Sequence, residues 1–496
     1  MTLTQNELRK IAGQLIMIRF PGTVLDQATA DFIRANGIRG VCLFRGNMTD
    51  SVQLAKLTAD LRDAMGPNAL IAIDQEGGAV VRSTWVPAPP AAMGLGAAND
   101  TDLAYRTGAA VARAVKALGF NWNFAPVLDV NNNPSNPVIG ERSFSNDPVE
   151  VSRLAAAWMR GSLREGVACC VKHFPGHGDT HVDSHHALPT VDKSRAELNA
   201  LELAPFKALA GQAPAMMTAH IVYPQIDPDR PATLSPQLIG GILRQDWGYD
   251  GVVITDALMM KAVAERFGYA KSAVMAIEAG ADMVLAQGSL DEQLVAINAL
   301  RQAFASGRLT TDQGETANRR LDTLAAAYPA RVVGDAAARA SDHALMADAW
   351  AAGLTTLRGA KPPALSAPIR VIVQGDVPTD MVSEAGPTGR QAVALFDAFA
   401  DAQVRMVDDI VQFDWSTLPK DGRFNIVVST RRARYGLAAS EWRPDLHLSL
   451  WNPYQALDVA GPTVLTWGFA PGALAGLKAW LEGRSQATGR APQGLQ

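Results

Sequence analysis

Short apolar runs alternate with amphipathic stretches of helical period from near the start of the chain to about residue 330, and this alternation constrains the fold more than any other feature. An apolar run followed by such a stretch is typical of a βα unit, in which a helix covers a buried parallel strand. Eight runs have the length and character of buried strands: residues 14–20, 40–44, 70–74, 123–130, 167–172, 215–220, 252–256 and 283–286. Eight such units predict an α/β fold of the TIM-like (β/α)8 barrel type.

Four amphipathic stretches are predicted to form helices on the outside of the barrel: residues 102–118, 149–164, 197–210 and 290–305. An open doubly wound sheet is the alternative, but no Gly-x-Gly-x-x-Gly directly follows a strand to mark a dinucleotide site. The barrel is favoured because several apolar runs end on a polar, titratable residue, and barrel enzymes carry their chemistry at the carboxyl ends of the strands. These residues are Asp74, Asp129, Lys172, His220 and Asp256.

A chain of 496 residues exceeds the size at which one hydrophobic core keeps growing, so two domains are expected. After an alanine-rich helical connection near residues 336–353, strand-like runs restart at 369–373, 404–407, 425–429, 446–450 and 463–466, with helices at 391–400 and 473–481. We therefore predict a catalytic barrel over residues 1–335 and a smaller C-terminal α/β domain over 336–496, with an open, mainly parallel sheet. Its strand ends show no comparable cluster of titratable groups, so the chemistry is expected in the barrel.

The charge and the cysteine content exclude several classes of partner. A formal net charge of −4 with no run of basic residues gives no surface for nucleic acid or for an anionic membrane. The N-terminus lacks the basic start and apolar stretch of a secretory signal, and no segment has the length of a membrane span. Three cysteines, Cys42, Cys169 and Cys170, offer neither a disulfide framework nor zinc spacing. A cytoplasmic enzyme that acts on a small or uncharged molecule is expected, whereas nothing predicts its oligomeric state.

Five of the eight histidines lie between Lys172 and His186, in a stretch that a core does not need. Four of them recur every four residues: His173, His177, His181 and His185. On a helix this spacing would place zinc ligands on one face, but Pro175, Gly176 and Gly178 disfavour a helix here. We therefore predict a loop that serves proton transfer and substrate binding, with no metal and no other cofactor; a structural histidine cluster is the alternative.

Asp256 follows the apolar run 251–255, where an uncompensated carboxylate would be costly to bury. Function explains it better than a salt bridge or a helix cap, which are the alternatives. Charged groups also follow apolar runs in other short blocks. In order along the chain the informative blocks are Asp74-Gln75-Glu76-Gly77-Gly78, residues 123–130, Gly140-Glu141-Arg142-Ser143-Phe144, Lys172-His173-Phe174-Pro175-Gly176-His177-Gly178, Asp183-Ser184-His185 and Thr255-Asp256.

This ordered set resembles the bacterial β-N-acetylhexosaminidases of glycoside hydrolase family 3 over most of residues 10–330. The resemblance implies a retaining exo-β-N-acetylglucosaminidase that removes terminal non-reducing N-acetylglucosamine. Asp256 would be the nucleophile, His185 the general acid and then base, and Asp183 the partner that orients the imidazole. The resemblance assigns substrate binding to Asp74, Arg82, Arg142, Lys172 and His173.

Several alternatives stay open at this point. The Asp183-Ser184-His185 element disfavours the β-glucosidases and xylosidases of the same family, whereas phosphorolysis fits a histidine acid that does not repel phosphate. An inert sugar sensor on the same barrel is a further alternative. The aglycone is open between an anhydromuramyl peptide from cell-wall recycling, a chitin fragment and another glycoconjugate. Ala79 and Ala257 stand where the family commonly has arginine and a second aspartate; the first bears on substrate subtype, and the second leaves Asp256 without a rival beside it.

Overall fold

The structure is a computed structural model that describes residues 4–184, 186–331, 340–376 and 389–495. Its larger part is a barrel of eight parallel strands, as predicted. In order around the barrel they are β1 (Ile16–Ile18), β2 (Gly40–Cys42), β3 (Leu70–Ile73), β6 (Trp122–Asn123), β7 (Ala168–Phe174), β8 (Ala215–Thr218), β11 (Val252–Thr255) and β12 (Val284–Ala286). β12 pairs with β1, and a parallel bridge between Ile254 of β11 and Met283, directly before β12, closes the ring.

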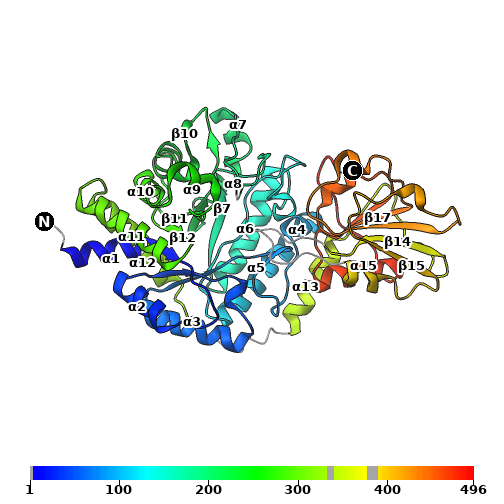
Figure 1. The fold of residues 1–496 in the computed structure, drawn as a ribbon, viewed down its shortest axis with the longest axis horizontal. Helices are drawn as coiled ribbons and strands as arrows, with labels where there is room; N and C mark the ends of the chain where they lie inside the picture. The colour runs from blue at the N-terminus through cyan, green and yellow to red at the C-terminus, as the bar shows by residue number, and fades with distance from the viewer. Residues whose placement is uncertain (1–3, 185, 332–339, 377–388, 496) are drawn as a thin grey trace.

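Helices surround these strands (Figure 1). They are α1 (Gln5–Gln14), α2 (Gln27–Asn36), α3 (Ser51–Met65), α4 (Ala92–Ala98), α5 (Thr101–Ala117), α6 (Pro148–Arg164), α7 (Arg195–Ala200), α8 (Leu203–Leu209), the helical segment Gln237–Asp246, α9 (Lys261–Phe267), α10 (Tyr269–Ala279), α11 (Leu290–Ala305) and α12 (Thr311–Ala327). Side-chain caps fix where several of them begin, because a polar side chain there accepts a backbone amide that has no partner within the helix. Asp147 caps α6 and Ser289 caps α11 in this way.

The predicted helix over residues 197–210 is broken into α7 and α8. The break falls at Leu201, whose backbone leaves the helical region (φ −127°, ψ −81°). Pro205 explains it, because a proline ring clashes with the carbonyl four residues before it and removes the amide that would bond there. The other three barrel helices predicted from the sequence match α5, α6 and α11 within one residue at each end.

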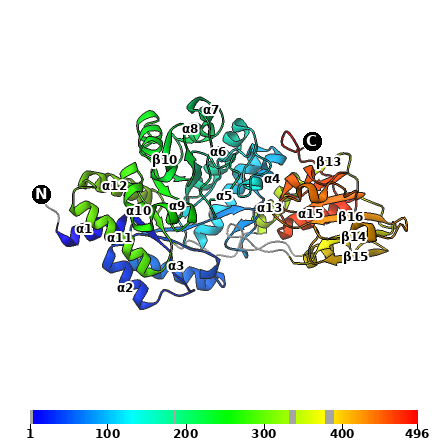
Figure 2. The same ribbon diagram turned by 45° about the horizontal axis from the view of Figure 1, so that its top comes forward.

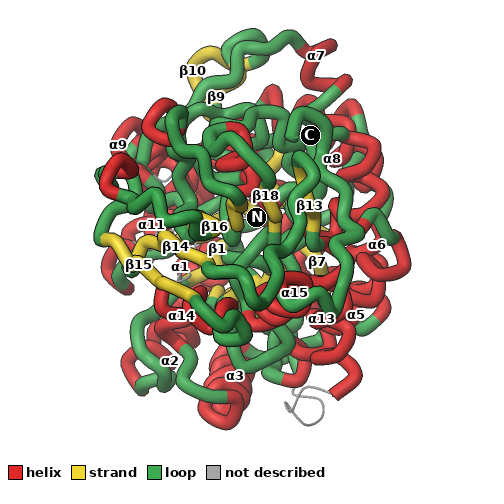
Figure 3. Tube along the Cα trace, turned by 90° about the vertical axis from the view of Figure 1, so that its right-hand side faces the viewer, coloured by secondary structure: helices red, strands yellow, loops and turns green. Residues whose placement is uncertain are grey.

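The C-terminal part contains a second, open sheet whose strand order is β13-β18-β17-β16-β14-β15. The strands are β13 (Thr355–Leu357), β14 (Ile369–Gln374), β15 (Ala402–Val407), β16 (Phe424–Ser429), β17 (Leu446–Ser449) and β18 (Thr463–Leu465). All neighbours are parallel except β13, which pairs antiparallel with β18 and was not predicted. The helices here are α13 (Ala340–Gly353), α14 (Gly389–Val393) and α15 (Pro471–Leu481). The sheet is therefore mainly parallel, as predicted. β15 lies at one edge of this sheet (Figure 3).

The two sheets lie at opposite ends of the molecule, with α13 between the barrel helix α5 and α15 (Figures 1 and 2). Each has its own apolar core; the larger one fills the barrel and its helix layer. Arg113 of α5 joins the two parts through an ion pair with Asp342 of α13, in which Nη2 lies 2.6 Å from Oδ1. The predicted boundary between residues 335 and 336 falls within 332–339, outside the described residues, so that boundary stays a prediction.

Candidate active site

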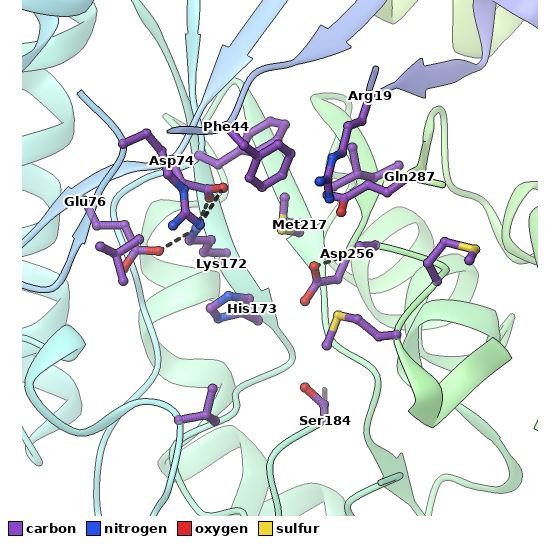
Figure 4. Close-up of a pocket in the computed structure, with 18 of the residues that line it drawn as sticks. Arg19, Phe44, Asp74, Glu76, Lys172, His173, Ser184, Met217, Asp256 and Gln287 are labelled. Carbon is purple, nitrogen blue, oxygen red and sulfur yellow. Dashed lines mark hydrogen bonds and ion pairs between the residues drawn. The ribbon is translucent and has the colours of Figure 1, made fainter. Parts of the chain in front are cut away.

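A pocket of about 710 Å³ opens at the carboxyl ends of the barrel strands. Six of the residues proposed from the sequence line it: Asp74, Arg82, Arg142, Lys172, His173 and Asp256. In Figure 4, Asp74, Glu76, Lys172 and His173 lie toward one side of the pocket, and Asp256 and Gln287 toward the other. These six residues, which span 182 positions of the sequence, thus meet in one cavity, because parallel strands all place their carboxyl ends at the same rim.

The hairpin after β3 positions two charged side chains. Asp74 directly follows β3, and the short strands β4 (Gln75–Gly77) and β5 (Val80–Val81) form the hairpin that carries Glu76 and leads to Arg82. Gly77 has φ +131°, and a Cβ atom there would lie 2.2 Å from the carbonyl oxygen of Pro90. Glycine is therefore required at this turn, since any side chain would push the hairpin away from the pocket wall.

Buried opposite charges form a network on this side of the pocket. Lys172 Nζ lies 2.7 Å from Asp74 Oδ1 and 2.6 Å from Glu76 Oε1. Arg142 holds Glu76 through two parallel hydrogen bonds, from Nε to Oε2 (2.9 Å) and from Nη2 to Oε1 (2.8 Å). Lys172 and Arg142 are 2% and 7% exposed, so each charge depends on its partners for compensation.

The network keeps its members charged at neutral pH. Burial alone would raise the pKa of Glu76, but Arg142 and Lys172 outweigh burial and hold that pKa well below its usual range. In the same way, burial would lower the pKa of Lys172, yet Asp74 and Glu76 raise it above its ordinary value. Ionised groups make the strongest hydrogen bonds to sugar hydroxyls, so this wall is suited to bind a carbohydrate.

Asp129 lies beneath the pocket and fixes the first two histidines of the cluster. Its fully buried carboxylate accepts the ring Nδ1–H of His173 at 2.7 Å and the backbone amide of His177 at 2.6 Å. Burial would raise the pKa of Asp129, but the neighbouring His173 lowers it below the ordinary value. With Nδ1 donating to Asp129, the Nε2 atom of His173 is an acceptor, and it lies 3.5 Å from Arg142 Nη2.

His177 connects the pocket to the predicted acid–base element. Its ring is buried, and its Nε2 lies 2.9 Å from the hydroxyl of Ser184, which also lines the pocket. Burial lowers the pKa of His177 to about 4, so the ring is neutral at pH 7 and orients Ser184 by hydrogen bonding alone. Ser184 stands between Asp183, which is partly buried, and His185, which lies outside the described residues. The structure thus brings Ser184 to the pocket, with Asp183 beside it in the chain, and the roles of Asp183 and His185 stay predictions.

Asp256 lies directly after β11, partly buried and facing into the pocket (Figure 4). Its Oδ1 accepts the backbone amide of Ala257 at 2.7 Å. The carbonyl of Ala257 in turn accepts a hydrogen bond from Nε2 of the buried His220, at 3.0 Å. His220 is therefore placed to support the turn that carries Asp256.

The remaining histidines of the cluster lie apart from the pocket. His181 and His186 are exposed, and His181 Nδ1 accepts from Asn133 at 3.2 Å. Over the described residues, no three or more His, Cys, Asp or Glu side chains are arranged to hold a metal ion. The absence of a metal requirement stays a prediction.

Several lining residues were not proposed as site residues from the sequence: Arg19, Phe44, Glu76, His177, Met217, Lys261 and Gln287. Arg19 and Phe44 lie at the ends of predicted strands and Gln287 directly follows one, so their place at a strand end is the available signal. Glu76 stood within a noted block, but its partners lie 66 and 96 positions away, and no local pattern reveals them.

A closed parallel barrel with a charged pocket at its strand ends defines a (β/α)8-barrel enzyme. The sequence pattern of the glycosyl hydrolase family 3 N terminal domain matches residues 7–324, so the chain belongs to this family of glycoside hydrolases. The structure is similar to that of a family 3 β-N-acetylglucosaminidase from Paenibacillus sp. str. FPU-7, with a TM-score of 0.85, 34% identity and coverage of 99% of this chain and 98% of that chain.

Two curated relatives extend the comparison. A β-hexosaminidase of Alkalilimnicola ehrlichii is 41% identical over 281 residues, which make up 54% of this chain and 79% of that protein. Beta-hexosaminidase A of Pseudoalteromonas piscicida is 38% identical over 286 residues, 53% of this chain, and the match spans about half (48%) of that protein's length. Among the described helices, none combines the length and apolar character needed to cross a bilayer.

Proposed function

We propose that the protein is a retaining exo-β-N-acetylglucosaminidase that works through a covalent glycosyl-enzyme intermediate. The observation that carries this proposal is the placement of Asp256 in one pocket with the Asp74, Lys172 and His173 wall. One side of the pocket is suited to hold a sugar, and the other presents a carboxylate. The names of the similar proteins support N-acetylglucosamine as the sugar.

In the proposed mechanism a carboxylate oxygen of Asp256 attacks the anomeric carbon, and the bond from that carbon to the aglycone oxygen breaks. His185 gives its proton to the departing oxygen. A water molecule then attacks the same carbon, returns a proton to His185 and releases Asp256. Asp183 acts through His185, holding its tautomer and stabilising the cation that forms when the ring accepts a proton.

Sugar recognition falls to Asp74, Arg82, Arg142, Lys172 and His173. The charges of Asp74, Arg82, Arg142 and Lys172 are already held in ion pairs, so little reorganisation is needed when a sugar hydroxyl replaces water. His173 offers an acceptor at Nε2 because Asp129 holds its Nδ1–H. The cytoplasmic location and a place in cell-wall recycling belong to this proposal as expectations from the sequence and its resemblance.

A panel of 4-nitrophenyl glycosides tests the proposal. We expect turnover of the N-acetyl-β-glucosaminide to exceed that of the β-glucoside and β-xyloside by a factor of about 100 or more. A site that binds the acetamido group of the sugar discriminates against sugars that lack this group. Activity should persist in EDTA. The competing phosphorolysis would release N-acetylglucosamine 1-phosphate when inorganic phosphate is added, whereas hydrolysis releases the free sugar. Equal rates on all three glycosides would contradict the assignment of substrate.

The C-terminal part is proposed to support the pocket wall that contains Arg142. Trp451 Nε1 donates to the buried carboxylate of Glu141 at 2.8 Å, and Arg432 Nη2 donates to the carbonyl of Val138 at 2.6 Å. Val138 and Arg142 both line the pocket. Burial raises the pKa of Glu141, while Arg432 and Trp451 oppose this rise, so the carboxylate depends on both C-terminal residues.

Replacing Trp451 with phenylalanine is expected to leave Glu141 without one donor, at a cost of about 1–3 kcal/mol in the free energy of unfolding. The wall should also shift, so kcat/KM for the N-acetylglucosaminide should fall several-fold. Trp480→Phe is the matched control, since Trp480 is buried in the C-terminal core. Urea denaturation and steady-state kinetics measure both effects. If the two variants lost the same activity, the link to the pocket would be refuted.

A further inference from the structure

Arg19 extends the pocket on the Asp256 side of the barrel. It follows β1, and Gln287 follows β12; these strands pair with Ile18 opposite Ala286, so Arg19 and Gln287 occupy adjacent positions at the rim. The backbone carbonyl of Arg19 accepts a hydrogen bond from Gln293 Nε2 at 2.5 Å. Figure 4 shows Arg19 and Gln287 on the same side of the pocket as Asp256.

The charges that line the pocket do not balance. Five Lys or Arg side chains face three Asp or Glu side chains, although the chain as a whole carries a formal charge of −4. Lys172, Arg82 and Arg142 are buried and pair with Asp74 and Glu76. The remaining two cations, Arg19 and Lys261, are exposed, and neither forms an ion pair with a carboxylate among the described residues. The pocket lining therefore carries more positive than negative side chains, although the net charge of the chain is negative.

The Arg19 side chain is also held in place by the ring of Phe44. Its guanidinium carbon lies 5.1 Å from the centroid of the Phe44 ring, and that of Arg82 lies 5.5 Å from the same centroid. A guanidinium stacked on an aromatic ring loses less freedom when it binds a planar oxyanion than one that moves freely in water. Phe44 itself lines the pocket, so the stacking keeps Arg19 at the pocket rim.

We infer that Arg19 and Lys261 form a subsite for an oxyanion next to the bound sugar. This inference rests on the proposed function. The buried wall of Asp74 and Lys172 would hold the sugar, and the exposed rim would then contact the aglycone or the acceptor. The anion is either a carboxylate on the aglycone or inorganic phosphate that replaces water as the acceptor. Both are planar or compact oxyanions that accept hydrogen bonds from a guanidinium and an ammonium group.

Two matched glycosides test this subsite: 4-carboxyphenyl N-acetyl-β-glucosaminide and its neutral 4-carbamoylphenyl counterpart. The readout is the ratio of kcat/KM for the acid to kcat/KM for the amide. Arg19→Gln and Lys261→Gln should each lower this ratio about two- to fivefold, the range for an exposed ion pair, and added salt should shrink the difference. The controls Arg160→Gln and Lys271→Gln change exposed cations outside the pocket and should keep the wild-type ratio.

Phosphate distinguishes the two sources. If phosphate is the ligand, N-acetylglucosamine 1-phosphate should form from the neutral glycoside, and Arg19→Gln should reduce its yield; if an aglycone carboxylate is the ligand, only the substrate ratio should change. Binding is measured without turnover by adding protein to phosphate or to benzoate and recording the broadening of the anion's NMR signal. Wild-type protein that failed to cleave the neutral glycoside would refute the proposed function alone. An unchanged ratio, together with anion binding equal in wild type and Arg19→Gln, would refute the subsite.

Discussion

Replacing Asp256 with alanine is expected to lower kcat on an aryl N-acetyl-β-glucosaminide by at least about three orders of magnitude, because the covalent intermediate needs its carboxylate. The other carboxylates lining the pocket are unsuited to substitute for it. Asp74 and Glu76 are held in ion pairs by Lys172, Arg82 and Arg142. Steady-state kinetics over a range of substrate concentrations separates this loss in kcat from any change in KM.

Asp256→Asn is the matched control, since it keeps the shape of the side chain and removes its charge. Both variants should unfold at nearly the same urea concentration as the wild type, because Asp256 is only partly buried and lies at a loop. A variant that retained more than about a tenth of wild-type kcat while remaining folded would show that Asp256 does not form the intermediate.

The second large effect concerns His185 and depends on the leaving group. Protonation of the departing oxygen matters most for a poor leaving group, since a nitrophenolate departs nearly unaided and a sugar alkoxide does not. His185→Ala should therefore reduce kcat/KM for a disaccharide by a factor of about 10² to 10⁴, and glycosylation by a dinitrophenyl glycoside by less than about tenfold. Asp183→Ala should show the same selectivity in weaker form, because the imidazole remains.

His186→Ala provides the control for this experiment. His186 is the exposed neighbour in the same loop, so its replacement tests whether any change at this position disturbs the site. We expect kcat/KM of that variant to stay within about twofold of the wild type on both substrates. Equal losses of His185→Ala on the disaccharide and the aryl glycoside would mean that His185 binds substrate or shapes the pocket, and the acid would then be sought at His173, His177 or Glu141.

The barrel was predictable because a parallel strand buried on both faces must be apolar along its length. The first four residues of β7, residues 168–171, are apolar and fully buried, and this run is visible in the sequence. The polar residue at the end of such a run is equally visible, which is why the sequence predicts Asp74, Lys172 and Asp256 as site residues. In the C-terminal sheet, β13 escaped prediction because a three-residue edge strand has too few positions to show a pattern.

The functions of individual histidines were not predictable from spacing. His173, His177 and His181 recur at equal intervals, yet the first two face the pocket and the third is exposed. What separates them is Asp129, which comes from another strand end and fixes His173 and His177 through contacts 44 and 48 positions away. The sequence also gives no sign that Arg19 and Lys261 lack a carboxylate partner among the described residues, since pairing is decided by tertiary contacts.

The central claim is that Asp256 carries the sugar during turnover, and trapping of the intermediate tests it most directly. A 5-fluoro analogue of an activated N-acetyl-β-glucosaminide should form the glycosyl ester and hydrolyse it slowly, because fluorine destabilises the transition states for both steps. After digestion, mass spectrometry should find the sugar on the peptide that contains Asp256, and Asp256→Ala should acquire no label. A label on the peptide of Glu76, Asp129 or Glu141 would contradict the account.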